Sequence, residues 1–114
     1  MIKVIDIPPD KIVISIYKFN QKVKSGKKEY VYPAVNLRIS YQGKFVKIGF
    51  LEKRLKALLI NLNFKLHPEI VENKYIVIEP EKWKEMAKVI DKTLNADGKY
   101  YRKIRKIFVG DKNA

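Results

Sequence analysis

Aromatic rings and basic side chains share one side of the strands predicted in the first half of the chain. Successive side chains of a β-strand point to opposite faces, so residues of equal parity lie together. Flat rings can stack on nucleobases, for roughly 1–3 kcal/mol each, while cations beside them neutralise phosphates. The rings are Tyr17, Phe19, Tyr30, Tyr32 and Phe45, and the cations are Lys22, Lys24, Lys27, Lys28, Arg38 and Lys47.

A predicted hairpin over residues 35–50 positions two of these cations. Its two-residue turn, Gln42-Gly43, supplies the glycine that such turns need for positive φ, and it fixes the register. Apolar residues then face one another on one side, as Val35 with Phe50, Leu37 with Ile48 and Ile39 with Val46. On the other side Ser40 faces Phe45 and Arg38 faces Lys47. Because adjacent cations repel, the Arg38–Lys47 pair favours an anion between them.

The spacing of apolar residues along the chain, alternating in some segments and helical in others, predicts a two-layer α+β fold. It has an antiparallel sheet of about five strands packed against two helices. Strands are expected over 1–7, 11–20, 30–41, 44–50 and 74–79, with a further short one over 64–68. The first helix is expected over 52–62, with an apolar stripe formed by Leu51, Leu55, Leu58, Leu59 and Leu62; the second begins at Pro80, with Trp83, Met86, Ala87, Ile90 and Leu94 facing the core. Residues 20–29 are expected to form a mobile polar loop.

The predicted domain covers residues 1–98. Residues 99–114 form a basic C-terminal tail or short helix, whose cations Arg102, Lys103, Arg105 and Lys106 add phosphate-binding capacity.

The net charge of +13 is unevenly distributed. Residues 11–65 hold 13 cations and two acids, and residues 99–114 hold six cations and one acid, whereas 66–98 are slightly acidic. Such localisation favours a polyanionic partner. The competing explanation is a lysine-rich composition typical of a thermophile or an AT-rich genome, since 21 of the 25 cations are Lys.

The sequence lacks the residues that several kinds of cofactor and metal sites require. There is no cysteine, one histidine and no glycine-rich phosphate loop, so no cofactor or metal site is expected. No apolar run reaches the length of a membrane span, and the expected location is cytoplasmic. A metal-independent ribonuclease remains formally available through Tyr32, Arg38, Glu52 and His67.

Residues 76–86, Ile-Val-Ile-Glu-Pro-Glu-Lys-Trp-Lys-Glu-Met, resemble the strand-to-helix junction of the positive-cofactor family of transcriptional coactivators. The resemblance covers about a tenth of the chain. It implies a dimer of curved antiparallel sheets that binds single-stranded DNA, with the helix as dimer interface and Trp83 as a structural residue. The predicted helix over 52–62 departs from that family.

The hairpin followed by a helix also resembles the arm-binding domains of phage-type integrases, in which a three-stranded sheet enters the duplex major groove.

These observations predict a non-enzymatic nucleic-acid-binding protein that prefers single strands, with weak sequence specificity and no catalytic residues. One alternative is a duplex-DNA-binding regulator that uses the hairpin or the basic tail. Another is a small accessory or inhibitor protein that docks an acidic protein partner, and the third is the ribonuclease. A homodimer formed through a helix or a sheet edge is a further expectation.

Overall fold

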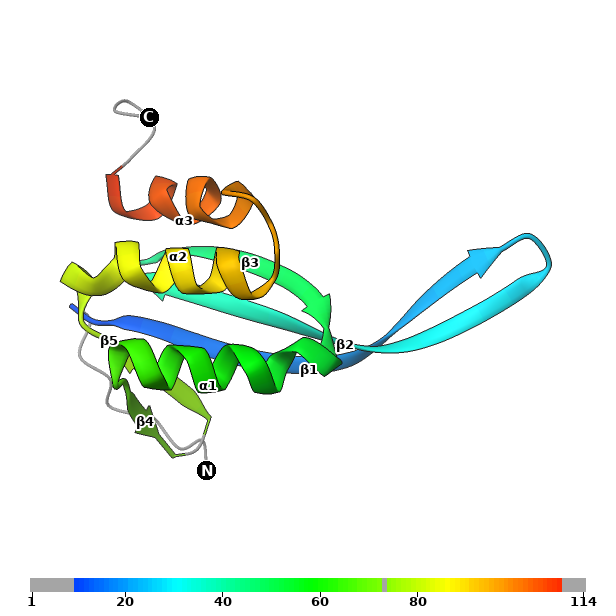
Figure 1. The fold of residues 1–114 in the computed structure, drawn as a ribbon, viewed down its shortest axis with the longest axis horizontal. Coiled ribbons are helices and arrows are strands. Elements are labelled where there is room, and N and C mark those ends of the chain that lie inside the picture. Colours follow the sequence, from blue (N-terminus) through cyan, green and yellow to red (C-terminus); the bar gives the residue numbers. More distant parts are fainter. Residues whose placement is uncertain (1–9, 73, 110–114) are drawn as a thin grey trace.

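The computed structural model describes residues 10–72 and 74–109, which form one antiparallel sheet covered on one face by helices (Figure 1). The strand order is β3-β2-β1-β5-β4. The expected α+β class is therefore confirmed, although three α-helices, not two, lie on the sheet. The elements are β1 (Ile12–Ser25), β2 (Lys28–Tyr41), β3 (Lys44–Leu51), η1 (Glu52–Arg54), α1 (Leu55–Leu66), β4 (Glu69–Val71), β5 (Tyr75–Ile78), η2 (Pro80–Lys82), α2 (Trp83–Thr93) and α3 (Lys99–Val109).

The predicted hairpin between β2 and β3 is confirmed pair by pair. Arg38 lies opposite Lys47, and Ile39 lies opposite Val46. Gln42 and Gly43 both adopt positive φ, of 48° and 80°, as a tight two-residue turn between twisted strands requires. The apolar side of the hairpin faces the helices, where Leu37, Ile39 and Ile48 are fully buried or nearly so.

The expected loop over residues 20–29 is instead the end of a second, longer hairpin. β1 and β2 pair without interruption from Val13–Ser40 to Ser25–Lys28, and Gly26 takes the positive φ of 64° in the turn. We call residues 20–33 the arm, because β3 has ended at Leu51, opposite Ala34, and the last six β1–β2 pairs have no third strand. At about 3.3 Å per residue, six residues of strand span roughly 20 Å. Figure 1 shows the arm projecting beyond the rest of the sheet.

The first helix begins near its predicted start, with the 3₁₀ turn η1 leading into α1, but it continues one turn beyond its predicted end. It runs over Leu55–Leu66, so the short strand expected over 64–68 is wrong, and a different strand, Glu69–Val71, follows the helix. Burial of Leu62 and Leu66, one turn apart, favours the helix. The helix ends at His67, which adopts a left-handed conformation and donates its backbone N–H to Asn63. Leu51, expected in the helix stripe, lies at the exposed end of β3.

The segment expected as a tail or short helix is the helix α3 over Lys99–Val109, and it packs into the core through its apolar side chains. Ile104 is completely buried. Phe108 stacks between Trp83 of α2, at 5.1 Å between ring centroids, and Tyr41 of β2, at 5.0 Å. The predicted apolar stripe of α2 is also in the core, with Met86, Ala87 and Ile90 fully buried. Residues 110–114 lie outside the described residues.

An ion pair of 2.6 Å joins Lys11, the residue before β1, to Glu79, the residue after β5. This hydrogen-bonded carboxylate raises the pKa of Lys11. The strand expected over 1–7 lies outside the described residues. Within the described residues, no helix is long and apolar enough to cross a membrane.

Candidate nucleic-acid interface

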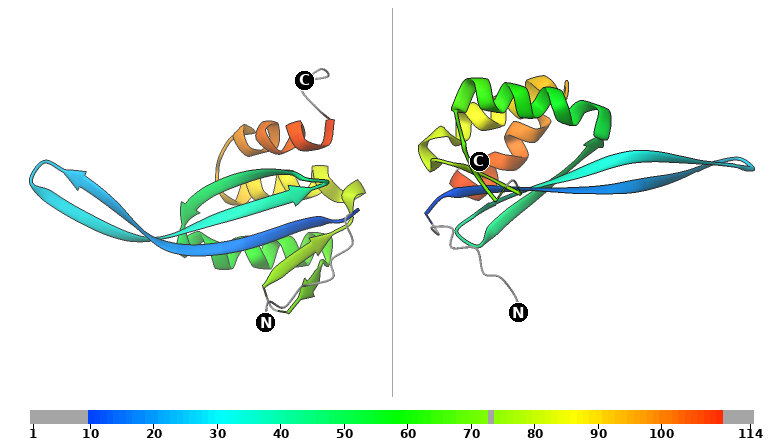
Figure 2. Two further views of the ribbon diagram at one scale, coloured as in Figure 1. Left: turned by 180° about the vertical axis from the view of Figure 1, so that it is seen from behind. Right: turned by 90° about the horizontal axis from the view of Figure 1, so that it is seen from below.

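In the described part of the chain, the helices lie on one side of the sheet and leave the other side uncovered (Figure 2, right). The strand register places the five predicted rings on this uncovered side, together with Lys28, Arg38 and Lys47. Strand pairing arranges them in rows, because directly opposite residues of an antiparallel pair point to the same side. The rows that run outward along β1, β2 and β3 are Val13–Ser40–Phe45, Ser15–Arg38–Lys47, Tyr17–Asn36–Gly49 and Phe19–Ala34–Leu51. On the arm they continue as Gln21–Tyr32, Val23–Tyr30 and Ser25–Lys28. We call this surface the open face.

The five predicted rings all lie on the open face and all are exposed. Their exposed fractions range from 37% for Phe19 to 52% for Tyr17. Tyr30 and Tyr32 are nearly parallel neighbours on the arm, with ring centroids 6.3 Å apart and an angle of 20° between the ring planes. Five exposed rings on one face give planar ligands such as nucleobases several places to stack.

Arg38, Phe45 and Lys47 form a compact group near the centre of the open face. The guanidinium carbon of Arg38 lies 4.2 Å from the Phe45 ring centroid, and Lys47 Nζ lies 5.9 Å from it. The electron-rich ring face attracts both cations, so it explains part of their proximity without a bound anion. Arg38 Nε is buried and has no hydrogen-bond partner in the described part of the chain. Because the guanidinium is planar, it is itself a surface on which a base can stack.

The arm carries two of its lysines on the side opposite its rings. Tyr30, Tyr32 and Lys28 share the open face, whereas Lys22 and Lys24 pair with Val31 and Glu29 on the opposite side. Lys27 lies in the turn at the tip. A strand of nucleic acid that stacks on the tyrosines would therefore meet these lysines at the tip and around the edges of the arm.

Val23 belongs to the open face but was not among the predicted site residues. It lies opposite Tyr30 and is 42% exposed. The signal for it is the alternation of Lys22, Val23 and Lys24 before a glycine, which is typical of a strand entering a hairpin turn.

A hollow of about 460 Å³ lies at the base of the arm. Tyr32 and Pro33 of β2 form one side, and Leu51, Glu52 and Lys53 form the other. The hollow thus places an exposed ring beside apolar surface and one cation. A base can stack on such a ring while its phosphate contacts the cation. Glu52 is partly neutralised by Lys18, whose Nζ lies 3.3 Å from the carboxylate.

The predicted cations of the C-terminal segment are not brought to the open face. They lie on α3, in the helical layer, and Lys103 donates a hydrogen bond of 2.9 Å to the backbone carbonyl of Lys47 at the sheet edge. Arg102 lines a hollow between α2 and α3, Lys106 is exposed, and Arg105 is partly buried.

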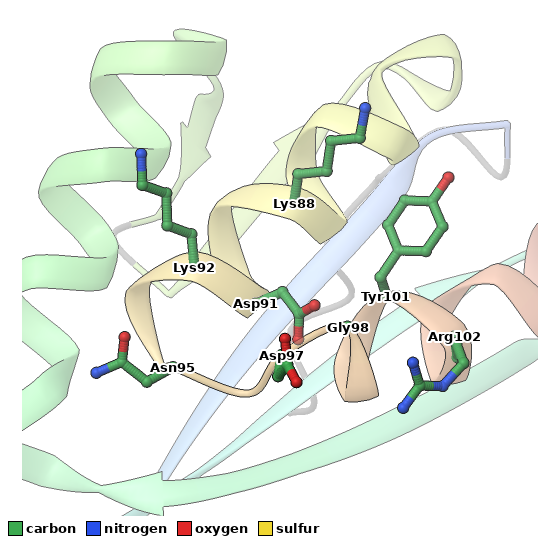
Figure 3. A pocket seen from close by; sticks show the side chains of 8 residues that line it. All are labelled: Lys88, Asp91, Lys92, Asn95, Asp97, Gly98, Tyr101 and Arg102. Atoms are coloured by element: carbon green, nitrogen blue, oxygen red, sulfur yellow. The ribbon is translucent and has the colours of Figure 1, made fainter.

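The hollow between α2 and α3 measures about 670 Å³ and is drawn in Figure 3. Asp91 is the most buried of its lining residues, about nine-tenths buried, and its carboxylate accepts a hydrogen bond of 3.1 Å from the backbone N–H of Tyr100. A carboxylate that satisfies a free N–H in the first turn of a helix stabilises that helix. Asp91 therefore has a structural task, which is to hold the start of α3.

Of the four residues of the ribonuclease alternative, only Tyr32 and Glu52 come together, at the hollow at the base of the arm. Tyr32 and Arg38 are six residues apart on one strand, roughly 20 Å, and Glu52 and His67 flank opposite ends of α1. Among the described residues no group of three His, Cys, Asp or Glu side chains is placed to hold a metal ion.

No protein-family model, curated protein or solved structure matches this chain.

Proposed function

We propose that this protein binds single-stranded nucleic acid on its open face, without catalysis and with little sequence specificity. The observation that carries the proposal is the set of five exposed rings on one face, from Phe45 on the sheet to Tyr30 on the arm. Stacking accounts for affinity without reading base identity, since every base has a flat face.

The strand would follow the long direction of β1 and β2. Bases stack on Tyr30 and Tyr32 at the arm, on Tyr17 and Phe19 at its base, and on the Arg38–Phe45 group over the sheet. Lys28, Lys47 and Lys53 contact the phosphates, and the electrostatic part of the affinity weakens with salt.

The test is fluorescence anisotropy with single-stranded DNA, single-stranded RNA and duplex DNA of equal length at two salt concentrations. Tyr32→Ala should weaken single-strand binding by about 5- to 150-fold, the equivalent of one stacked base, and should affect duplex binding less. Phe64→Ala is the matched control, because Phe64 is a ring 72% exposed on α1, in the opposite layer. Equal effects of the two substitutions, or equal binding of all three nucleic acids that vanishes with salt, would contradict the proposal.

The arm favours one second candidate, which is binding of duplex DNA. A two-stranded ribbon fits the major groove, and six unsupported β1–β2 pairs provide such a ribbon. Under this candidate, Tyr32→Ala would weaken duplex binding at least as much as single-strand binding.

A further inference from the structure

The outer face of α1 carries an exposed apolar stripe on the side of the molecule opposite the open face. Ile60 is 57% exposed and Phe64 is 72% exposed, with the exposed Ala57 one turn before Ile60. At 100° per residue, these three positions point away from the buried Leu58 and Leu62. A helix that is apolar on both sides of its axis is typical of one that packs on both sides.

A hollow of about 230 Å³ adjoins this stripe. Leu59 and Asn63, the residues immediately before Ile60 and Phe64, form its α1 side, and Pro68 and Ile70 form its β4 side. Ile70 is itself 59% exposed. The hollow is smaller than the 300–1,000 Å³ typical of small-molecule pockets, so its size suits a single inserted side chain.

Charge indicates what covers the stripe. The exposed charged residues of η1 and α1, which flank the stripe, are all cations, namely Lys53, Arg54, Lys56 and Lys65. On the far side of the hollow the charges are mixed, because the cation Lys74 lines it and the exposed acids Glu69 and Glu72 lie near Ile70. The one acid of η1 and α1, Glu52, is already paired with Lys18. A second copy docked on this face would bring the same cations against one another, because an isologous interface pairs a patch with itself. An acidic segment would instead be attracted to them.

We propose that the outer face of α1, with the adjoining hollow, docks an acidic amphipathic segment of a partner protein. Apolar anchors of that segment cover Ile60 and Phe64, one anchor enters the hollow beside Leu59, and its carboxylates meet the flanking cations. The site does not depend on the nucleic-acid function. Since it lies in the helical layer, it remains accessible when the open face is occupied.

The experiment titrates the full-length protein against a fluorescein-labelled helical peptide with leucines at helical spacing and glutamates elsewhere. Two control peptides are used: one with the same composition scrambled to remove the stripe, and one with lysine in place of glutamate. The expected result is saturable binding of the acidic amphipathic peptide alone. Ile60→Ser and Phe64→Ser should each weaken it by about tenfold or more, as loss of an anchor does. Val31→Ser, which removes a 54% exposed aliphatic side chain from the arm, should have no effect.

Three results would overturn the inference. They are equal binding of all three peptides, no binding of any, or a dimer in sedimentation equilibrium that Phe64→Ser dissociates, which would assign the stripe to a second copy. The same serine variants titrated with single-stranded DNA keep the two proposals separate. If a serine variant keeps DNA binding but loses peptide binding, the result supports the α1 site, and it does so whether or not the open-face proposal holds.

Discussion

Removal of the arm should abolish most single-strand binding and leave the domain folded. The variant replaces residues 21–32 with the dipeptide Asn-Gly, which closes a hairpin between Asn20 and Pro33, a pair that already lies opposite in the sheet. The loss includes Tyr30 and Tyr32, worth roughly 2–6 kcal/mol together if each stacks one base. The expected loss of affinity is therefore between about 30-fold and about 2 × 10⁴-fold.

The same deletion removes four lysines, at positions 22, 24, 27 and 28. Each phosphate contact contributes about 0.7 to the slope of log K against log salt for single strands. The slope should thus become shallower by at most about 2.8. Anisotropy titrations at four or more salt concentrations measure both quantities on one oligonucleotide, and thermal unfolding confirms that the domain is intact. An unchanged affinity with an unchanged slope would refute a role for the arm.

Two further predictions concern the sheet and the third helix. Arg38→Lys keeps the charge but loses the planar group over Phe45, so single-strand affinity should fall by about fivefold with no change in salt slope; a changed slope with full affinity would contradict the stacking role. Ile104→Ala should destabilise the domain by about 2–5 kcal/mol and lower Tm by roughly 10 °C or more, because Ile104 is the fully buried side chain through which α3 packs into the core. A Tm unchanged within error would mean that residues 99–109 form a mobile tail instead of a core helix.

Local patterns were enough to predict the central hairpin. The Gln42-Gly43 turn and the alternation of apolar residues specify one register, and a slip by one residue would expose Ile39 and Ile48. The alternation of side chains along each strand also correctly placed the five rings on one side of the sheet. This prediction needed no knowledge of the rest of the fold, because a strand fixes the direction of its side chains.

The outer part of the arm, residues 21–29, was missed because polarity was used as a sign of a loop, whereas residues 30–33 were correctly predicted as strand. Residues 20–33 bury almost nothing, so their sequence shows no apolar stripe, and only β1–β2 backbone pairing and the turn at Gly26 hold them in register. Within the described residues the sheet has five strands, the predicted number, but not the same members: Glu69–Val71 was not predicted, and residues 64–66 of the strand expected over 64–68 belong to α1. For that segment, burial of Leu66 against the core decides in favour of the helix.

The place of α3 also depends on tertiary contacts. Its basic composition suggested a phosphate-binding tail, yet Tyr101 and Phe108 pack against Trp83, which is distant in the sequence. This packing moves Arg102 and Lys103 away from the open face. Charge patterns count cations but do not say which layer of a fold they will occupy.

Photo-crosslinking with a single-stranded oligonucleotide that contains 5-iodouracil tests the open face most directly. Irradiation of the complex, digestion and mass spectrometry identify the side chains in contact with the bases. The open face predicts crosslinks at Tyr17, Tyr30, Tyr32 and Phe45, all of which are exposed on one side of the sheet. Crosslinks confined to the helical layer, at Phe64 or Tyr100, would contradict the assignment and place the nucleic acid on the other side of the molecule.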